Sequence, residues 1–196
     1  MNKGFTLVEL LAVITIIAMI TVVAVPAAIT FQTNMSKKMY CSKVETIESA
    51  GRQYGNDLYG TIESDIDGII ANDKLNLGCP DNMKQCFMIN VNLLLEKKYL
   101  KPETDKGRTG EYLDPRDFSS LRKYPVLVYM ENRRIYSRFI YPTFADLELC
   151  NPLEYVDSNK DLYYLNETST NTYDIYKYIN STKIKIKKNK TIVDYP

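Results

Sequence analysis

Glu9 is the one charged residue in the longest apolar stretch of the chain, residues 5–25. A carboxylate deep in a bilayer costs roughly 2–3.5 kcal/mol on insertion scales, so such a charge marks a functional residue by default. The chemistry open to it is ion pairing, because opposite charges in a low dielectric compensate each other's desolvation only when they meet closely. The alternative is that Glu9 lies at the membrane interface or extends outward to water.

The chain contains no histidine. Histidine is the side chain whose ordinary pKa best suits proton transfer near neutral pH, and it is the commonest metal ligand. Its absence excludes Ser-His-Asp, Cys-His and histidine-ligated metal sites within this chain. Lysines, tyrosines and paired carboxylates show no recognised catalytic spacing. We therefore expect no enzymatic activity, no cofactor and no metal site.

Four cysteines offer disulfide chemistry. Cys79 and Cys86 flank a short loop, and closing it would stabilise the fold by about 2.5 kcal/mol in the chain-entropy model. We predict a Cys79–Cys86 bridge if the domain lies in an oxidising compartment, with free thiols as the alternative. Cys41 and Cys150 leave a second bridge open, because spacing does not fix the pairing of four cysteines. A zinc site is not expected, since C-x-x-C pairs are absent.

Three lysines, Lys183, Lys185 and Lys187, alternate with other residues and would share one face of a strand. Such a row could bind DNA phosphates or anionic wall polymers. The alternative, which we favour, is an edge strand that lysines protect against aggregation. The net charge of +1, from 25 basic and 24 acidic residues, gives no global attraction to nucleic acid.

Residues 5–25 have the length of a membrane-spanning helix. At 1.5 Å per residue they reach about 31 Å, close to the ~30 Å hydrocarbon core of a bilayer. A cleaved secretory signal fits less well, because its apolar region is usually about 7–15 residues long. Lys3 on the short side and a long polar domain on the other predict a C-terminus outside the cell. Pro26 is expected to kink the helix as it leaves the membrane.

The helix is expected to continue from Ala27 to about Leu58. An apolar seam with spacings of 3 and 4 predicts that this half packs on the chain's own sheet; its members are Val44, Ile47, Gly51, Tyr54 and Leu58. Gly60 is a natural stop signal.

The remaining chain contains the patterns of a small sheet. Residues 125–131 and 134–141 alternate and predict a hairpin joined at Asn132–Arg133. Further strands are expected at 162–165, 173–179 and 184–193, the last with a turn at Lys188–Asn189. Residues 90–100 predict a short helix capped by Asn90, and 105–120 predict a loop. The fold class is therefore α+β, with a long N-terminal helix packed on a small antiparallel β-sheet domain.

The stretch Lys3-Gly4-Phe5-Thr6-Leu7-Val8-Glu9 and the apolar helix after it resemble the type IV prepilin and pseudopilin family. The resemblance implies cleavage after Gly4 by a prepilin peptidase and N-methylation of the new Phe5 amine. It also implies that Glu9 of one subunit pairs with the Phe5 amine of a neighbour. In that family a proline at the place of Pro26 marks a bend or, in filaments, a locally melted segment.

The resemblance implies four segments: a leader at 1–4, a transmembrane and assembly helix at 5–30, a stalk helix at 31–60 and an extracytoplasmic domain at 61–196. The partners implied are the peptidase/methyltransferase, other pilin or pseudopilin subunits, a membrane assembly platform and, before assembly, lipid. A pattern at 94–100 followed by proline is similar to Gram-positive pseudopilins. The function expected is a filament subunit for secretion, DNA uptake or a surface pilus. The alternative is a minor or tip subunit whose C-terminal domain binds DNA or a surface.

Overall fold

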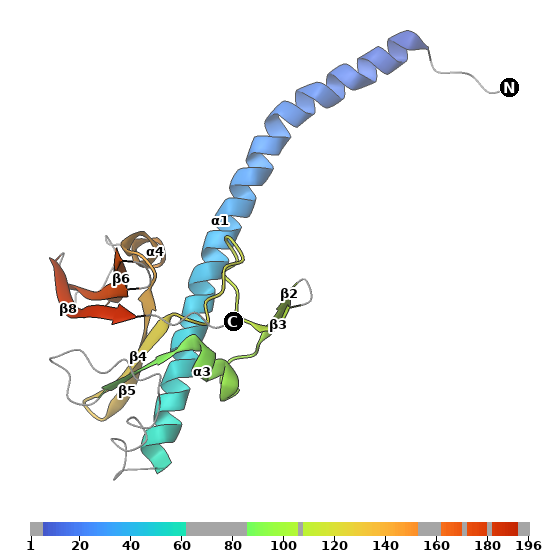
Figure 1. Cartoon of the computed structure of the whole chain (residues 1–196). Helices are drawn as coiled ribbons and strands as arrows, with labels where there is room; N and C mark the ends of the chain where they lie inside the picture. Colours follow the sequence, from blue (N-terminus) through green and yellow to red (C-terminus); the bar gives the residue numbers. More distant parts are fainter. Residues whose placement is uncertain are drawn as a thin grey trace.

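A computed structural model describes residues 6–61, 86–105, 108–152, 162–169, 172–179 and 182–191. It is dominated by α1 (Leu7–Thr61), one helix of 55 residues that projects far beyond the rest of the molecule (Figure 1). Pro26 lies inside α1, and the helix continues past it. Figure 1 shows α1 as a curved rod. A local kink at Pro26, and its melting in a filament, stay predictions.

The globular part, here called the head, is built on a six-stranded sheet in the order β1-β4-β5-β6-β7-β8. Neighbouring strands are antiparallel except for β5 and β6, which pair in parallel over two residues. The strands are β1 (Cys86–Asn90), β4 (Pro125–Glu131), β5 (Arg134–Tyr141), β6 (Leu162–Ser169), β7 (Thr172–Ile179) and β8 (Thr182–Thr191). The α+β class, with a long helix on a mostly antiparallel sheet, is confirmed.

Smaller elements connect and flank the sheet. They are α3 (Val91–Glu96), the ribbon of β2 (Glu103–Asp105) and β3 (Arg108–Glu111), and α4 (Phe144–Cys150). Asn90 caps α3 as predicted, since its side chain accepts a hydrogen bond from the Leu93 amide at 2.9 Å. The helix then ends in a Schellman motif, in which the Tyr99 amide donates to the Leu94 carbonyl and the Lys98 amide to that of Leu95.

The C-terminal half of α1 packs on β4 and β5 through the predicted seam. Val44 and Ile47 are buried, and Tyr54 and Leu58 pack against the same core. Two glycines one turn apart bring the helix backbone close to the sheet. A Cβ added at Gly55 would lie 2.7 Å from Ile135 Cγ2, and a Cβ at Gly51 would lie 2.3 Å from Ser137 Oγ. Side chains larger than hydrogen at these positions would push α1 away from the sheet.

The β4–β5 hairpin matches its predicted boundaries, with Glu131 opposite Arg134. Asn132 and Arg133 form the turn and both have positive φ, 50° and 61°. This is the geometry of a type I′ turn, whose backbone twist suits a two-residue hairpin.

Several elements differ from the sequence prediction. β8 runs on through Lys188 and Asn189, where a turn was predicted. The predicted loop at 105–120 contains β3, and β1 and α4 were not predicted. In α4 the Thr143 hydroxyl accepts from the Asp146 amide at 3.1 Å and donates to the Asp146 carboxylate at 2.7 Å, so a local cap defines this short helix.

Candidate functional site

The N-terminal end of α1 holds Glu9 in a defined orientation. The Thr6 amide and the Thr6 hydroxyl both donate to Glu9 Oε2, at 2.9 Å and 2.8 Å. In return the Glu9 amide donates to Thr6 Oγ1 at 3.3 Å. This reciprocal arrangement is a capping box, which satisfies amide groups that the first turn of a helix leaves open. The carboxylate therefore points toward the start of the helix, the side from which the chain enters.

This geometry leaves one oxygen of Glu9 for another group. Within the described residues Oε1 accepts no hydrogen bond, while Oε2 serves the cap. An ammonium group approaching the end of the helix could bind Oε1 without breaking the capping box. Gly4 and Phe5 lie outside the described residues, so their predicted roles in processing, methylation and assembly stay predictions.

The first part of α1 presents apolar side chains outward. Every described side chain from Thr6 to Asn34 is exposed, and Tyr40 is the first buried one. By length and composition this helix could cross a membrane. An exposed helix surface with Glu9 as its one charge requires either lipid or other helices around it, because large apolar patches on soluble proteins mark interaction surfaces.

Residues 1–25 match the family model described as the prokaryotic N-terminal methylation motif. The chain carries the N-terminal motif of type IV prepilins and pseudopilins. The match covers the residues before α1 and the first part of α1, and it leaves the head unassigned. Comparisons with curated proteins and with solved structures found no significant match.

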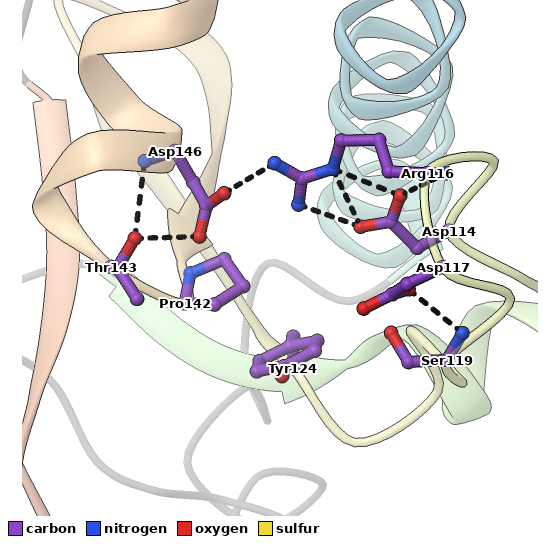
Figure 2. Close-up of a pocket in the computed structure, with 8 residues that line it drawn as sticks. All are labelled: Asp114, Arg116, Asp117, Ser119, Tyr124, Pro142, Thr143 and Asp146. Atoms are coloured by element: carbon purple, nitrogen blue, oxygen red, sulfur yellow. Dashed lines mark hydrogen bonds and ion pairs between the residues drawn. The ribbon is translucent and has the colours of Figure 1, made fainter. Parts of the chain in front are cut away.

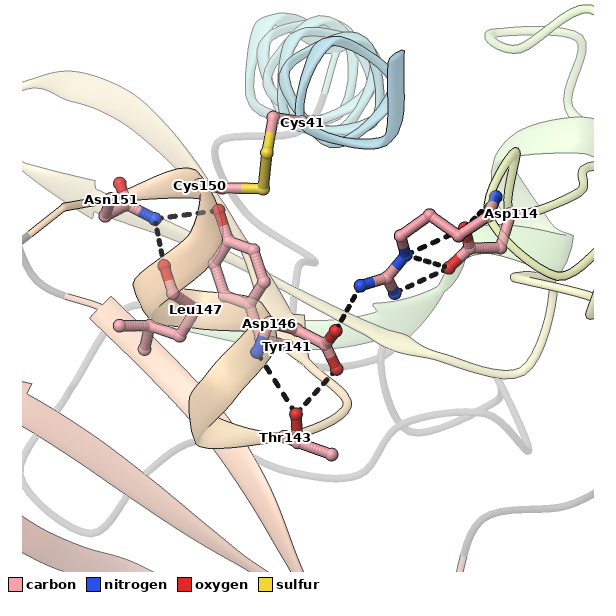
Figure 3. The surroundings of a disulfide bond; sticks show 9 residues. Cys41, Asp114, Tyr141, Thr143, Asp146, Leu147, Cys150 and Asn151 are labelled. Carbon is pink, nitrogen blue, oxygen red and sulfur yellow. Dashed lines mark hydrogen bonds and ion pairs between the residues drawn. A yellow bond between two sulfur atoms is a disulfide. The ribbon is translucent and has the colours of Figure 1, made fainter. Parts of the chain in front are cut away.

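A disulfide between Cys41 and Cys150 ties the head of this prepilin-like chain to α1 (Figure 3). It joins residues 109 positions apart, and Cys41 directly follows the first buried residue of α1. The second bridge that the sequence left open therefore exists. Cys86 is also disulfide-bonded. Cys79 lies outside the described residues, so its pairing with Cys86 stays a prediction.

Beside the disulfide, Arg116 connects three parts of the molecule (Figure 2). Its Nη2 lies 2.7 Å from Asp114 Oδ2, and its Nη1 lies 2.5 Å from Asp146 Oδ1 on α4. The guanidinium carbon lies 3.7 Å from the centre of the Tyr40 ring on α1. Burial alone lowers the pKa of Arg116, but the hydrogen bonds to Asp114 and Asp146 outweigh this effect and raise the pKa. We call Arg116, Asp114, Asp146 and Tyr40 together the Arg116 lock.

The Arg116 lock borders a cavity of about 430 Å³, whose walls include Tyr124, Pro142 and Thr143. The sequence did not single out Arg116. Asp114 lies two positions before it without forming a recognised motif, and Asp146 lies 30 positions after it. The two carboxylates are engaged by one cation, which favours a structural role. No group of three or more acidic or cysteine side chains in the described ranges is arranged to hold a metal ion.

The lysine row on β8 is interrupted. β8 is the terminal strand of the sheet, in agreement with an edge position. Lys183 and Lys185 lie opposite Tyr178 and Tyr176, but a bulge then places Lys187 opposite Ile175. Ile175 belongs to the core on the other face of the sheet. The three lysines therefore do not follow one uninterrupted face, contrary to the sequence pattern. Anion binding by Lys183, Lys185 and Lys187 stays a prediction.

Lys183 has a partner inside the head. Its Nζ lies 3.6 Å from the centre of the Phe144 ring at the start of α4. A cation over an aromatic face is stabilised by the ring quadrupole. This contact favours a structural role for Lys183 over a site reserved for external anions.

Proposed function

We propose that this chain is a type IV pilin-like or pseudopilin subunit that is cleaved after Gly4 and assembled into a membrane-anchored filament. The observation that carries the proposal is the N-terminal methylation motif at residues 1–25, which continues into an exposed apolar helix. The folded head at the other end of α1 supports it, since a filament subunit needs both a packing helix and a soluble domain.

The proposed mechanism makes cleavage the step that permits assembly. Before cleavage the Phe5 nitrogen is part of a peptide bond and carries no charge. Hydrolysis of the Gly4–Phe5 bond leaves a free amine at Phe5, which is protonated at neutral pH. That ammonium would bind Glu9 of a neighbouring subunit, where each charge compensates the desolvation of the other. The capping box supports this step because it directs the Glu9 carboxylate toward the helix end.

The partners of this proposal follow from its chemistry. A membrane peptidase cuts the leader and methylates Phe5, an assembly platform extracts the subunit, and lipid surrounds the first half of α1 until then. The head lies outside the cell. Secretion, DNA uptake and surface attachment use the same N-terminal chemistry, and the proposal covers all three.

The test compares processing with assembly in cells that contain a prepilin peptidase and an assembly platform. Peptide mass spectrometry of the sheared surface fraction should find chains beginning at methylated Phe5. Glu9→Ala should be cleaved normally but should not enter that fraction, while Glu9→Asp retains partial assembly because it keeps the charge. Assembled chains that still begin with Met1 would contradict the proposal. Normal assembly of Glu9→Ala would remove its mechanism.

A second candidate function is a minor or tip subunit that binds DNA through the head. Its motivation is the concentration of lysines on the edge strand β8. Retention of DNA by the whole solubilised chain should then fall as salt rises, because binding releases counterions from phosphate. Charge reversal at Lys185 and Lys187 should abolish it, with Lys97 and Lys98 as a matched pair elsewhere on the surface. DNA binding that stays unchanged when salt is raised, or when Lys185 and Lys187 are reversed in charge, contradicts this candidate.

A further inference from the structure

Phe118 is the one large apolar side chain of the head that is strongly exposed among the described residues. It is 59% exposed, whereas every other strongly exposed large apolar residue lies on α1 between Leu7 and Met39. Its backbone has φ 60°, which bulky residues rarely adopt. A strained backbone at an exposed aromatic residue is an observation from which a binding role can be inferred.

The turn that carries Phe118 is held firmly. The Phe118 amide donates to the Asp114 carbonyl, and the Asp114 amide donates to the Ser119 carbonyl, both at 2.8 Å. Asp114 is in turn bound by Arg116, whose guanidinium lies over the ring of Tyr40 on α1. Figure 1 shows the segment between β3 and β4 running beside α1. The lock therefore fixes Phe118 at about the height at which α1 enters the head.

A second exposed apolar feature lies on the neck of α1. Phe31, Met35 and Met39 are 69%, 53% and 49% exposed. Their spacing of four residues places them on one side of the helix. The residues between them include Gln32, Asn34, Lys37 and Lys38. The segment from Phe31 to Met39, here called the neck, is thus a polar helix with one apolar stripe, and its two lysines make immersion in a bilayer costly.

The register of the proposed filament brings these two features to the same height. A bond between Glu9 of one copy and the Phe5 amine of the next displaces parallel helices by four residues, about 6 Å. Each residue of the outer copy then stands level with the residue four positions later in the inner copy. Met35 of the outer copy is therefore level with Met39 of the inner copy, one residue below the height of Tyr40. Arg116, two residues before Phe118, lies against the ring of this Tyr40 in the inner copy.

Charge complementarity supports the same partner. Asp117 is exposed beside Phe118, and its side chain accepts a hydrogen bond from the Ser119 amide at 2.9 Å. Hydrogen bonds from Ser119 lower the pKa of Asp117, so its carboxylate is charged. Lys38 lies beside the stripe on the other copy, while Lys37 lies on the opposite side of the helix. Phe118 thus has a negative charge next to its aromatic ring, and the stripe has the positive charge of Lys38 next to its methionines.

We infer that Phe118 of one copy packs on the stripe formed by Phe31, Met35 and Met39 of the next copy toward the filament tip. Phe118 and the stripe lie on different surfaces of the same chain, so the contact is head-to-tail and repeats without closing on itself. It gives the subunit a second contact, outside the membrane, in the register that Glu9 sets. The inference rests on the proposed function and specifies how neighbouring subunits meet.

Photocrosslinking in assembling cells tests the contact. A benzophenone analogue of phenylalanine replaces Phe118 in the full chain, with the exposed position Arg134 as a control. Irradiation should join position 118 to residues 31–39 of a second copy, as shown by peptide mass spectrometry of the assembled fraction. Crosslinks from 118 only to lipid, only to other parts of the chain, or to nothing would overturn the inference while the proposed function stands.

Two substitutions measure the strength of the contact. Phe118→Ser should reduce the assembled chain by about tenfold or more, as truncation of a buried aromatic anchor does, while Phe118→Leu should retain most of it. An intact Cys41–Cys150 bridge and unchanged thermal unfolding confirm that each variant folds. Native-level assembly of a folded Phe118→Ser chain would overturn the contact. If the native chain itself never assembles, the proposed function fails, and the contact fails with it.

Discussion

Gly51 of α1 and Ser137 of β5 are in direct contact: a Cβ at position 51 would lie 2.3 Å from Ser137 Oγ and 3.1 Å from Val126 Cγ1. Ser137 is 3% exposed, and its hydroxyl has no hydrogen-bond partner among the residues that the structure describes. The helix thus approaches the sheet at the cost of a buried, unsatisfied hydroxyl. Glu48, one turn earlier, accepts from the Phe139 amide at 3.0 Å and ties the same strand to α1.

Gly51→Ala should destabilise the head by about 1–3 kcal/mol, because overpacking outweighs the gain in helix propensity. Ser137→Ala alone should be neutral or stabilising, since it removes a buried polar atom without a partner. The double variant should recover part of the loss, leaving the contact with Val126. Chemical denaturation of the three variants measures the coupling. Additive effects would contradict the contact, and the exposed helical position Asn56→Ala serves as the control.

Loss of the Cys41–Cys150 bridge should lower the free energy of unfolding by about 2–5 kcal/mol, as for native bridges that close long loops. The variant Cys41→Ser with Cys150→Ser isolates this effect, and its thermal unfolding should be compared with that of the native chain. Adding reductant should then shift the native chain more than the variant. The paired variant Cys79→Ser with Cys86→Ser is the matched control, and it should cost less because the predicted Cys79–Cys86 bridge would close only a short loop. Equal costs would argue against the loop-closure account.

Arg133→Gly should stabilise the β4–β5 hairpin by about 0.5–1 kcal/mol, since glycine adopts the left-handed conformation of a type I′ turn without steric cost. The native arginine has φ 61°. The next residue, Arg134, lies in β5, where the same change to glycine should weaken the strand. Urea denaturation of both variants provides the comparison. A stabilising Arg134→Gly together with a destabilising Arg133→Gly would show that the turn has another geometry.

Stability should fall in alkali as tyrosines titrate. Burial, aided by the charge of Glu103, raises the pKa of Tyr112 to about 12, against about 10 in an unfolded chain. The folded state therefore holds this proton more tightly. Its contribution to the free energy of unfolding is complete below pH 10 and is lost as pH rises through 12. Tyr112→Phe should make the decline between these pH values shallower, as measured by denaturation at fixed pH. An unchanged slope would contradict this assignment. The pKa of Tyr40 and Tyr141 is raised by burial too, so some slope should remain.

The parts of this molecule that were predictable are those with local signals. The seam on α1 has helical spacing, the hairpin alternates, and Asn90 is followed by a short apolar helix, so each could be found from nearby residues. The turn predicted at Lys188–Asn189 was wrong because β8 continues through these residues, and the pairing with β7 takes up the irregularity there as a register shift between Lys187 and Lys190.

Contacts between distant residues had no such signal. Cys41 and Cys150 are 109 positions apart, and only the packing of α4 beside α1 brings them together. The ion pair between Arg116 and Asp146 likewise forms only because α4 packs beside α1. The bulge that moves Lys187 away from Lys183 arises from the pairing of β7 with β8, and alternation in a single strand does not reveal it.

The place of the disulfide has a mechanical consequence. Tension along a filament would enter each subunit through the exposed half of α1 and would reach the head first at Tyr40 and Cys41. Cys41 is covalently joined to α4, so the pull passes directly into Cys150 and the strand β5 that precedes α4. Peeling of α1 from β4 and β5, turn by turn, is thereby prevented at its starting point. In the proposed filament the bridge would therefore take this load before the seam from Val44 to Leu58 does.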